Sequence, residues 1–187
     1  MEKRIIVIGD PHGCRIELEE LLIKVNWNKE TDIVVIVGDL VDRGPDSVGV
    51  VRFCRENKIL SCLGNHEDKY LKYIKNSKDP KKNTKISDHK KQIIDQLSEK
   101  DIEYLASMKT HIKLSDNWYA VHAGFNPRKK IEEQASTDLA YIRYVDIDGN
   151  VVNGLNPPPG SLHWSDKWEN PQNVIYGHWI NSYFLTI

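Results

Sequence analysis

The sequence predicts an α/β fold whose first half is a parallel sheet. Three short apolar runs, each followed by a glycine, lie at Arg4–Ile8, Asp32–Val37 and Ile59–Leu63. Apolar residues at helical spacing separate these runs, over Arg15–Val25 and Asp46–Asn57. Apolar strands that alternate with amphipathic helices are typical of a parallel sheet buried on both faces. We therefore expect strand, helix, strand, helix and strand over this part of the chain.

The segment 69–91 differs in character from the strands and helices before it. It contains nine lysines and two aspartates, which gives a local net charge of +7. We interpret it as helix, loop and helix, within a small helical cap over residues 67–108 beside the main sheet. A lysine-rich segment is most often a solvated face. Attraction of a polyphosphate by its charge is the alternative.

The second half of the chain shows the pattern of β-structure. Two hairpins are predicted, His111–Ser115 with Trp118–His122 and Arg143–Asp146 with Val151–Val152, and a last strand at Asn173–Tyr176. The sequence Asp-Ile-Asp-Gly-Asn at 146–150 resembles part of a calcium-binding loop. Its glycine comes too early and no glutamate follows at the required position, so we interpret it as a hairpin turn.

Length and composition limit the classes of function. The chain has 187 residues, 40% of them hydrophobic and 28% charged, with a net charge of −1. This length suits one domain, residues 1–187. The charge does not point to nucleic acid, and no apolar run approaches the ~20 residues of a membrane span. Cys14, Cys54 and Cys62 lack metal-type spacing, so we expect free thiols in a reducing cytoplasm. No sequence feature indicates an oligomeric state.

Five clusters of metal-ligand residue types lie at the ends of predicted strands. They are Gly9-Asp10-Pro11-His12-Gly13, Gly38-Asp39-Leu40-Val41-Asp42-Arg43-Gly44, Gly64-Asn65-His66-Glu67, Val121-His122-Ala123-Gly124 and Tyr176-Gly177-His178-Trp179. One such cluster alone is usually a turn. Because ligands bind at the carboxyl ends of parallel strands, we expect the first three clusters to converge. Carboxylate, imidazole and amide oxygen together suit hard or borderline divalent metals.

With these five clusters in order, over residues 5–179, the chain resembles the calcineurin-like metallophosphoesterases, in their phosphoprotein-phosphatase branch. The resemblance implies an αββα sandwich with two metals. Its ligands, carried over by position, are Asp10, His12 and Asp39 for one metal and Asp39, Asn65, His122 and His178 for the other. Asp39 would bridge the two. Manganese is the first expectation, and iron, zinc, magnesium, nickel or cobalt are also reasonable for such ligands.

The same resemblance implies a reaction and the residues that carry it out. A hydroxide that bridges the metals would attack phosphorus directly, without a covalent phosphoenzyme. Arg43 matches the phosphate-binding arginine of the family, and Arg143 resembles a second one. His66 would protonate the leaving group, and Asp42 would orient its ring and keep it cationic. A scaffold that has lost catalysis is a distant alternative, because the chain retains every one of these residues.

Two substrate classes stay open. The sequences Gly-Asp-Leu-Val-Asp-Arg-Gly-Pro and Gly-Asn-His-Glu look like those of serine/threonine protein phosphatases. Gly-His-Trp, Gly13-Cys14 and the Arg143 strand with its Asp-Gly turn are similar to the symmetrical diadenosine tetraphosphate hydrolases. Those hydrolases generally lack an acidic residue at the Asp42 position. We favour dinucleoside polyphosphates, with a phosphoprotein as the second choice.

The carboxyl end is shorter than is usual for the family. The family continues past its last Gly-His with further strands, whereas this chain ends nine residues after His178. This is either a minimal version of the fold or a truncated one. In the second case an exposed strand edge near Val174–Tyr176 would favour association with another chain.

Overall fold

The predicted parallel sheet forms the centre of the structure. A computed structural model describes residues 3–79, 81–82 and 84–179. Strands β1 (Arg4–Ile8), β2 (Asp32–Ile36) and β3 (Leu60–Ser61) form a sheet in the order β1-β2-β3, with both pairs parallel. The third strand is shorter than predicted. Beyond Ser61 the Cys62 N–H still donates to the carbonyl of Ile36 in β2, and on its other side Cys62 forms an isolated bridge with Lys109.

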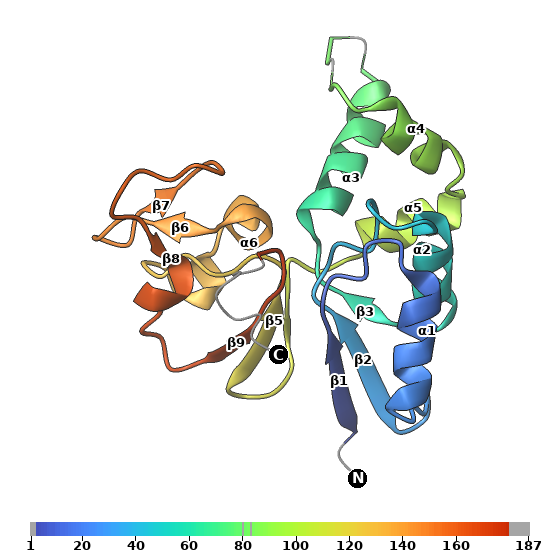
Figure 1. Ribbon diagram of the computed structural model, residues 1–187, viewed down its shortest axis with the longest axis horizontal. Helices are drawn as coiled ribbons and strands as arrows, with labels where there is room; N and C mark the ends of the chain where they lie inside the picture. The colour runs from blue at the N-terminus through green and yellow to red at the C-terminus, as the bar shows by residue number, and fades with distance from the viewer. Residues whose placement is uncertain (1–2, 80, 83, 180–187) are drawn as a thin grey trace.

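Helices α1 (Arg15–Lys24) and α2 (Ser47–Glu56) cover the outer face of this sheet (Figure 1). The Asp46 carboxylate accepts a hydrogen bond from the Gly49 N–H and so caps α2. In α1 only the i, i+4 pair Leu18 and Leu22 is buried, whereas Ile16 is 67% exposed. The helical spacing of α1 was therefore predicted well, but a narrower stripe than expected faces the sheet.

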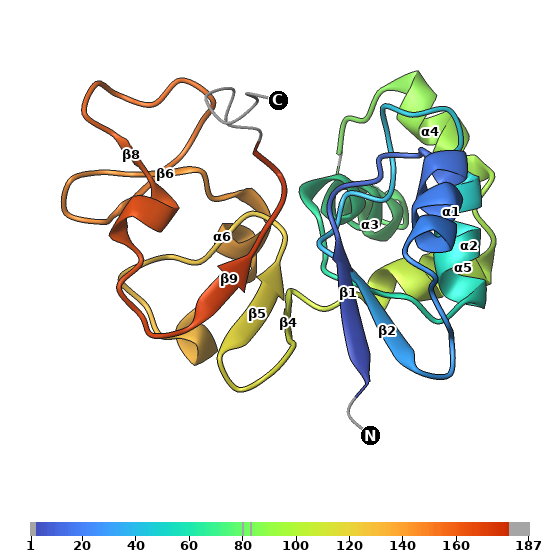
Figure 2. The same ribbon diagram turned by 60° about the horizontal axis from the view of Figure 1, so that its bottom comes forward.

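A second sheet packs face to face against the first. Strands β4 (His111–Lys113), β5 (Trp118–Val121) and β9 (Asn173–Ile175) form it in the order β4-β5-β9, with β5 and β9 parallel. Figure 2 shows β4, β5 and β9 beside β1 and β2. Val35, Val37 and Cys62 of the first sheet share one buried cluster with Ala120 of β5. The two sheets in contact are the two central layers of the αββα sandwich.

The outer face of the second sheet is covered by mixed structure. It consists of α6 (Ser136–Tyr141), the 3-10 turns Ile131–Glu133 and Trp164–Lys167, and a small sheet of β6 (Tyr144–Val145), β7 (Val151–Val152) and β8 (Leu162–His163) in the order β7-β6-β8. Val121 and Phe125 pack there against Leu139 and Trp164. Helix α6 was not predicted from the sequence, because this short helix buries only Leu139 and Ala140 and has no side-chain cap.

Three helices lie in the region predicted as a cap. They are α3 (Asn65–Ser77), α4 (Asp88–Asp95) and α5 (Glu99–Ala106). Eight of the nine lysines between 69 and 91 are exposed, as expected of a solvated face, and Lys90 is half-buried. The predicted turn at 146–150 is present, since Asp146 accepts hydrogen bonds from the backbone of Asp148 and Asn150.

Strand β9 pairs with β5 and stands at an edge of its sheet as far as the described residues go, and residues 180–187 lie outside them. Within the described part of the chain, no helix has the length and apolar character required to cross a bilayer.

Candidate metal centre

The loops that follow the three parallel strands meet at one edge of the first sheet. The backbone N–H of His12 donates to the carbonyl of Asp39 at 2.9 Å, and that of Gly13 donates to Leu40 at 2.8 Å. The first loop therefore rests on the second through main-chain hydrogen bonds. The third loop begins α3, whose N-terminal His66 N–H donates to Asp39 Oδ1 at 3.2 Å. A carboxylate at a helix N-terminus is electrostatically favoured.

The carboxylate of Asp39 stands between two groups of ligand atoms. Its Oδ2 lies 3.5 Å from His12 Nε2 and 3.8 Å from His66 Nε2. Its Oδ1 lies 3.3 Å from His122 Nε2. Histidines from three separate segments of the chain thus face the two oxygens of one buried residue, which is the arrangement expected of a bridging ligand.

Further ligand types surround His122. Its Nε2 lies 3.1 Å from Asn65 Oδ1 and 3.0 Å from His178 Nδ1. Asp39, His122 and His178 form one group that could hold a metal ion, and Asp39, His12 and His66 form another. The first group matches the predicted second metal site. In the other group His66 lies where the sequence analysis expected Asp10.

Asp10 lies close to the same centre. Its Oδ2 accepts a hydrogen bond from the backbone N–H of His178 at 2.8 Å, and its Oδ1 is 4.0 Å from His122 Nδ1. Asp10 Oδ1 and His178 Nε2 are both buried and have no hydrogen-bond partner. Buried polar atoms almost always have a partner, so an unpartnered carboxylate oxygen beside these histidines fits a site for a bound cation.

Two backbone carbonyls select the tautomer of two candidate ligand histidines. His12 Nδ1 lies 3.0 Å from the carbonyl of Val41, and His122 Nδ1 lies 3.1 Å from that of Val37. A carbonyl can only accept, so each Nδ1 carries the proton and each Nε2 keeps a free lone pair. This outer hydrogen bond is typical of histidines that bind metals.

The electrostatics of the site also fit bound cations. Burial, followed by the charges of Glu67 and Asp10, raises the pKa of Asp39 above its ordinary value. Burial raises the pKa of Asp10 to about 6. Burial, followed by the nearby His178, lowers the pKa of His122 well below its ordinary value. Neutral imidazoles and carboxylates that lack a compensating charge are the donor set that a divalent metal requires.

Backbone strain is concentrated at this centre. Seven residues other than glycine have positive φ in the described part of the chain, and five belong to the predicted site: His12, Asp39, Asp42, Arg43 and His178. Such conformations cost of order 1–3 kcal/mol each and cluster at functional sites. At Gly177 a Cβ would lie 2.0 Å from Asp10 Oδ1, so only glycine lets this loop approach the carboxylate.

His66 and Asp42 form a pair beside the other candidate metal ligands. His66 Nδ1 contacts Asp42 Oδ2, which leaves Nε2 pointing towards Asp39. Two further side chains contact Asp42, namely Tyr70 through Oδ1 at 2.6 Å and Lys90 through Oδ2. Burial would raise the pKa of Asp42, but the contacts from His66, Lys90 and Tyr70 outweigh it and lower this pKa.

The two predicted arginines both act on this centre. Arg43 is exposed, and its positive charge acts to lower the pKa values of Asp10, His12 and Asp39. Arg143 is half-buried, its Nε has no partner, and its guanidinium lies 5.6 Å from the centre of the Trp179 ring. Burial, followed by the charge of Arg143, lowers the pKa of His178 to about 3.

The comparison with protein families agrees with this geometry. Residues 3–184 match the family described as calcineurin-like phosphoesterase. The chain belongs to this family. It is therefore a metallophosphoesterase, a hydrolase, as the five clusters of the sequence indicated.

Three known proteins show what this phosphoesterase is similar to. An asymmetrical bis(5'-nucleosyl)-tetraphosphatase from Oceanobacillus iheyensis is 27% identical over 94% of this chain and 76% of its own. A symmetrical enzyme of that name from Nitrosospira multiformis is 33% identical over 69% of this chain, and the match spans 46% of its length. A crystal structure whose assignment as a diadenosine tetraphosphatase is provisional superposes with a TM-score of 0.81, at 29% identity over 95% of this chain and 76% of that one.

Three residues that shape the phosphoesterase site had no role predicted from the sequence. Glu67 belongs to a recognised cluster, but only the structure shows that it holds the Asp39 loop through backbone hydrogen bonds. Tyr70 follows Asp42 by 28 residues and Lys90 by 48, with no motif to connect them. Lys90 stood among eight other lysines, and no local signal distinguishes it from them.

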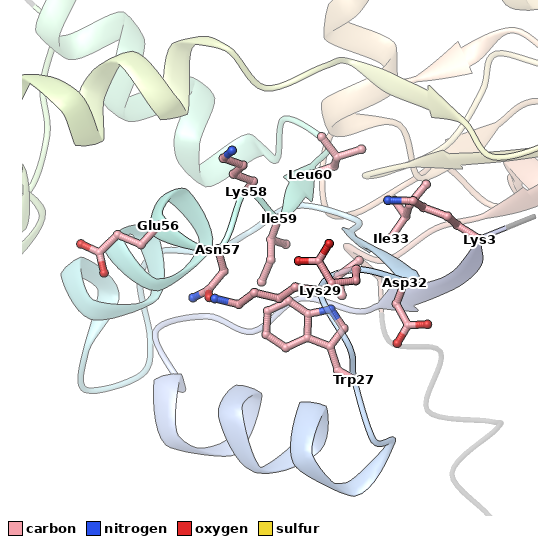
Figure 3. Close-up of a pocket in the computed structure, with 12 residues that line it drawn as sticks. Lys3, Trp27, Lys29, Asp32, Ile33, Glu56, Asn57, Lys58, Ile59 and Leu60 are labelled. Atoms are coloured by element: carbon pink, nitrogen blue, oxygen red, sulfur yellow. The ribbon is translucent and has the colours of Figure 1, made fainter.

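A cavity lies at the amino ends of strands β2 and β3 of the first sheet. Figure 3 shows Trp27, Asp32 and Lys58 among the side chains that line this space of about 470 Å³. Asp32 begins β2 and Leu60 begins β3, whereas the metal ligands follow the strands. This cavity is therefore separate from the metal centre.

Proposed function

We propose that this phosphoesterase hydrolyses dinucleoside polyphosphates of the diadenosine tetraphosphate type. The observation that carries the reaction class is the position of the Asp39 carboxylate between two groups of ligand atoms. The likeness to a bis(5'-nucleosyl)-tetraphosphatase over 94% of the chain supports the substrate class.

Asp39, His12 and Asp10 would hold one metal, and Asp39, Asn65, His122 and His178 the other. Divalent ions bound there would neutralise phosphate charge and lower the pKa of water towards neutrality. Manganese is our first choice, because nitrogen and oxygen donors of this kind suit it. His66 also belongs to the group of candidate ligands around His12 and Asp39. A change of His66 therefore tests metal binding and proton donation together.

The side chains around the metals have separate roles. Arg43 and Arg143 bind phosphate oxygens, since a forked guanidinium can form two parallel hydrogen bonds to phosphate. Water supplies the incoming oxygen. His66 gives its Nε2 proton to the leaving oxygen as the phosphorus–oxygen bond breaks, and Asp42 holds the ring through Nδ1.

Serine/threonine protein phosphatase activity is the second candidate. The contact of His66 with Asp42 favours it, because a serine alkoxide is a poor leaving group and requires a proton. A nucleoside polyphosphate leaves more readily and has less need of this pair.

The test is manganese-dependent turnover of diadenosine tetraphosphate beside a phosphoserine peptide, with His66→Asn as the matched variant. Chromatography of the nucleotides would separate two molecules of ADP, the product of central cleavage, from ATP with AMP, the product of off-centre cleavage. Faster turnover of the dinucleotide supports the proposal. Faster release of phosphate from the peptide, with strong dependence on His66, would replace it by the second candidate.

A further inference from the structure

Lys90 stands apart from the other lysines of the cap. Its side chain is 24% exposed, and its Nζ contacts Asp42 Oδ2. The same oxygen contacts His66 Nδ1. A lysine of α4 therefore reaches the pair that borders the metal ligands, whereas its neighbour Lys91 is exposed and points to solvent.

Tyr70 of α3 completes the surroundings of Asp42. Its hydroxyl donates to Asp42 Oδ1 at 2.6 Å, and the Lys90 Nζ lies 5.7 Å from the centre of its ring. The backbone N–H of Asp42 donates to Ser47 Oγ at 2.9 Å. Both carboxylate oxygens and the backbone are therefore held, so the carboxylate has one orientation to offer His66.

Lys90 also supplies a positive charge beside the buried Asp42 carboxylate. The Asp42 side chain is 6% exposed, and a buried carboxylate is stable only when it is paired and hydrogen-bonded. The cation comes from α4, 48 residues further along the chain. The packing of α4 beside the Asp42 loop therefore brings the Lys90 cation to the oxygen that contacts His66.

We propose that Lys90 is a positioning residue that, with Tyr70, holds Asp42 and through it the His66 ring for proton donation to the leaving oxygen. The inference rests on the proposed role of His66 in the hydrolysis. It links the cap to the proton-transfer step and gives one lysine of the basic segment a role that the others lack.

The first test compares two substrates that differ in the leaving group. Phenol is a poorer leaving group than p-nitrophenol and depends more on proton donation. We expect Lys90→Met to lower kcat on phenyl phosphate about tenfold, a fraction of the 10²–10⁴-fold typical of acid catalysis. The kcat on p-nitrophenyl phosphate and both KM values stay within about twofold of wild type. Lys90→Arg, which keeps a cation within reach of Asp42, restores most of the loss.

Lys91→Met is the matched control, because it removes a neighbouring lysine of α4 that is exposed. It behaves as wild type on both substrates. Equal losses on the two substrates, or a change in KM alone, would refute positioning and show a structural or binding role. If Lys90→Met does not fold, Tyr70→Phe removes one hydroxyl from the same carboxylate and is expected to show the same dependence on leaving group.

A second test does not depend on turnover. The NMR signals of the His66 ring, assigned with His66→Asn, shift in Lys90→Met and stay in place in Lys91→Met if Lys90 holds the pair. Unchanged His66 signals in a folded Lys90→Met protein would overturn the inference. A wild-type protein with no phosphoesterase activity would instead refute the proposed function and leave this measurement to decide the positioning.

Discussion

Glu67 accepts a hydrogen bond from the backbone N–H of Asp39 at 3.0 Å, through Oε2. Its other oxygen accepts from Val41 at 3.1 Å, and Oε2 also accepts from Gly64 at 3.2 Å. The Glu67 side chain is fully buried. The last residue of the third cluster therefore holds the backbone of the second cluster, and with it the carboxylate that stands between the two ligand groups.

Glu67→Gln is expected to destabilise the protein by about 1–3 kcal/mol, because the amide places its NH₂ against a backbone N–H and leaves that donor unpaired. The same change is expected to weaken metal binding, since the Asp39 loop loses a fixed contact. Urea unfolding and metal-binding calorimetry measure the two effects. Glu132→Gln, at an exposed position, is the control. Wild-type stability in Glu67→Gln would show that the loop is held by other contacts.

Asp39→Asn is expected to abolish turnover of every substrate while the fold is retained. One charged bridging ligand would be lost from both groups, so the fall should exceed the 10–100-fold typical of changes outside the ligand shell. Metal content by mass spectrometry should fall with activity, and a chelator should inactivate the wild type in the same way. Wild-type rates in Asp39→Asn would rule out the two-metal arrangement.

Arg143→Lys is expected to raise KM about tenfold, with a smaller effect on kcat. Lysine keeps the charge but loses the fork that binds two phosphate oxygens and the planar contact with Trp179. Steady-state kinetics on diadenosine tetraphosphate check this. Arg128→Lys is the control, because Arg128 is exposed and bonds to the hairpin at Asn150. An unchanged KM in Arg143→Lys would remove Arg143 from the binding site.

Asp32 is expected to make stability depend on acid pH. The Arg4 side chain, followed by the Asn28 N–H, lowers the pKa of Asp32 to about 2. Its unfolded value is about 4. A depressed pKa contributes stability above the unfolded value, and this contribution is lost as the pH falls from about 4 through about 2.

The unfolding free energies of wild type and Asp32→Asn, measured in urea from pH 6 downwards, test this expectation. The difference between them should be constant near neutrality and shrink below pH ~4. Asp116→Asn, whose carboxylate is fully exposed, is the control. A difference that does not change with pH would show that the Arg4–Asp32 contact is not linked to folding.

The three cysteines are expected to differ in reactivity. Burial raises the pKa of Cys54 and of Cys62 to about 12, so both thiols stay protonated and inert. Cys14 is half-buried. A thiol reagent at pH 8 should therefore modify one cysteine in the native protein and three after unfolding. Fast reaction of all three in the native state would show that the sheet interface around Cys62 opens readily.

The cytoplasmic location stays a prediction. Free thiols are the state expected of cysteines in that compartment.

Local patterns in the sequence determined the parallel sheet and pointed to the candidate metal ligands. A β-branched run followed by glycine specifies a strand and the turn after it, within a few neighbouring residues. Because parallel strands end at one edge, Asp10, Asp39 and Asn65 were expected to meet, and the structure brings them to one centre. His122 and His178 were found in the same way, from their places at strand ends.

Only the tertiary structure decided which residues hold these ligands in position. Glu67 acts through backbone hydrogen bonds, which any sequence can form, and so leaves no residue-type pattern. Lys90 differs from the eight exposed lysines around it only because α4 packs beside the Asp42 loop. Burial and long-range contact give these side chains their roles, and both depend on how the whole chain packs, since neighbouring residues do not determine which surfaces become buried.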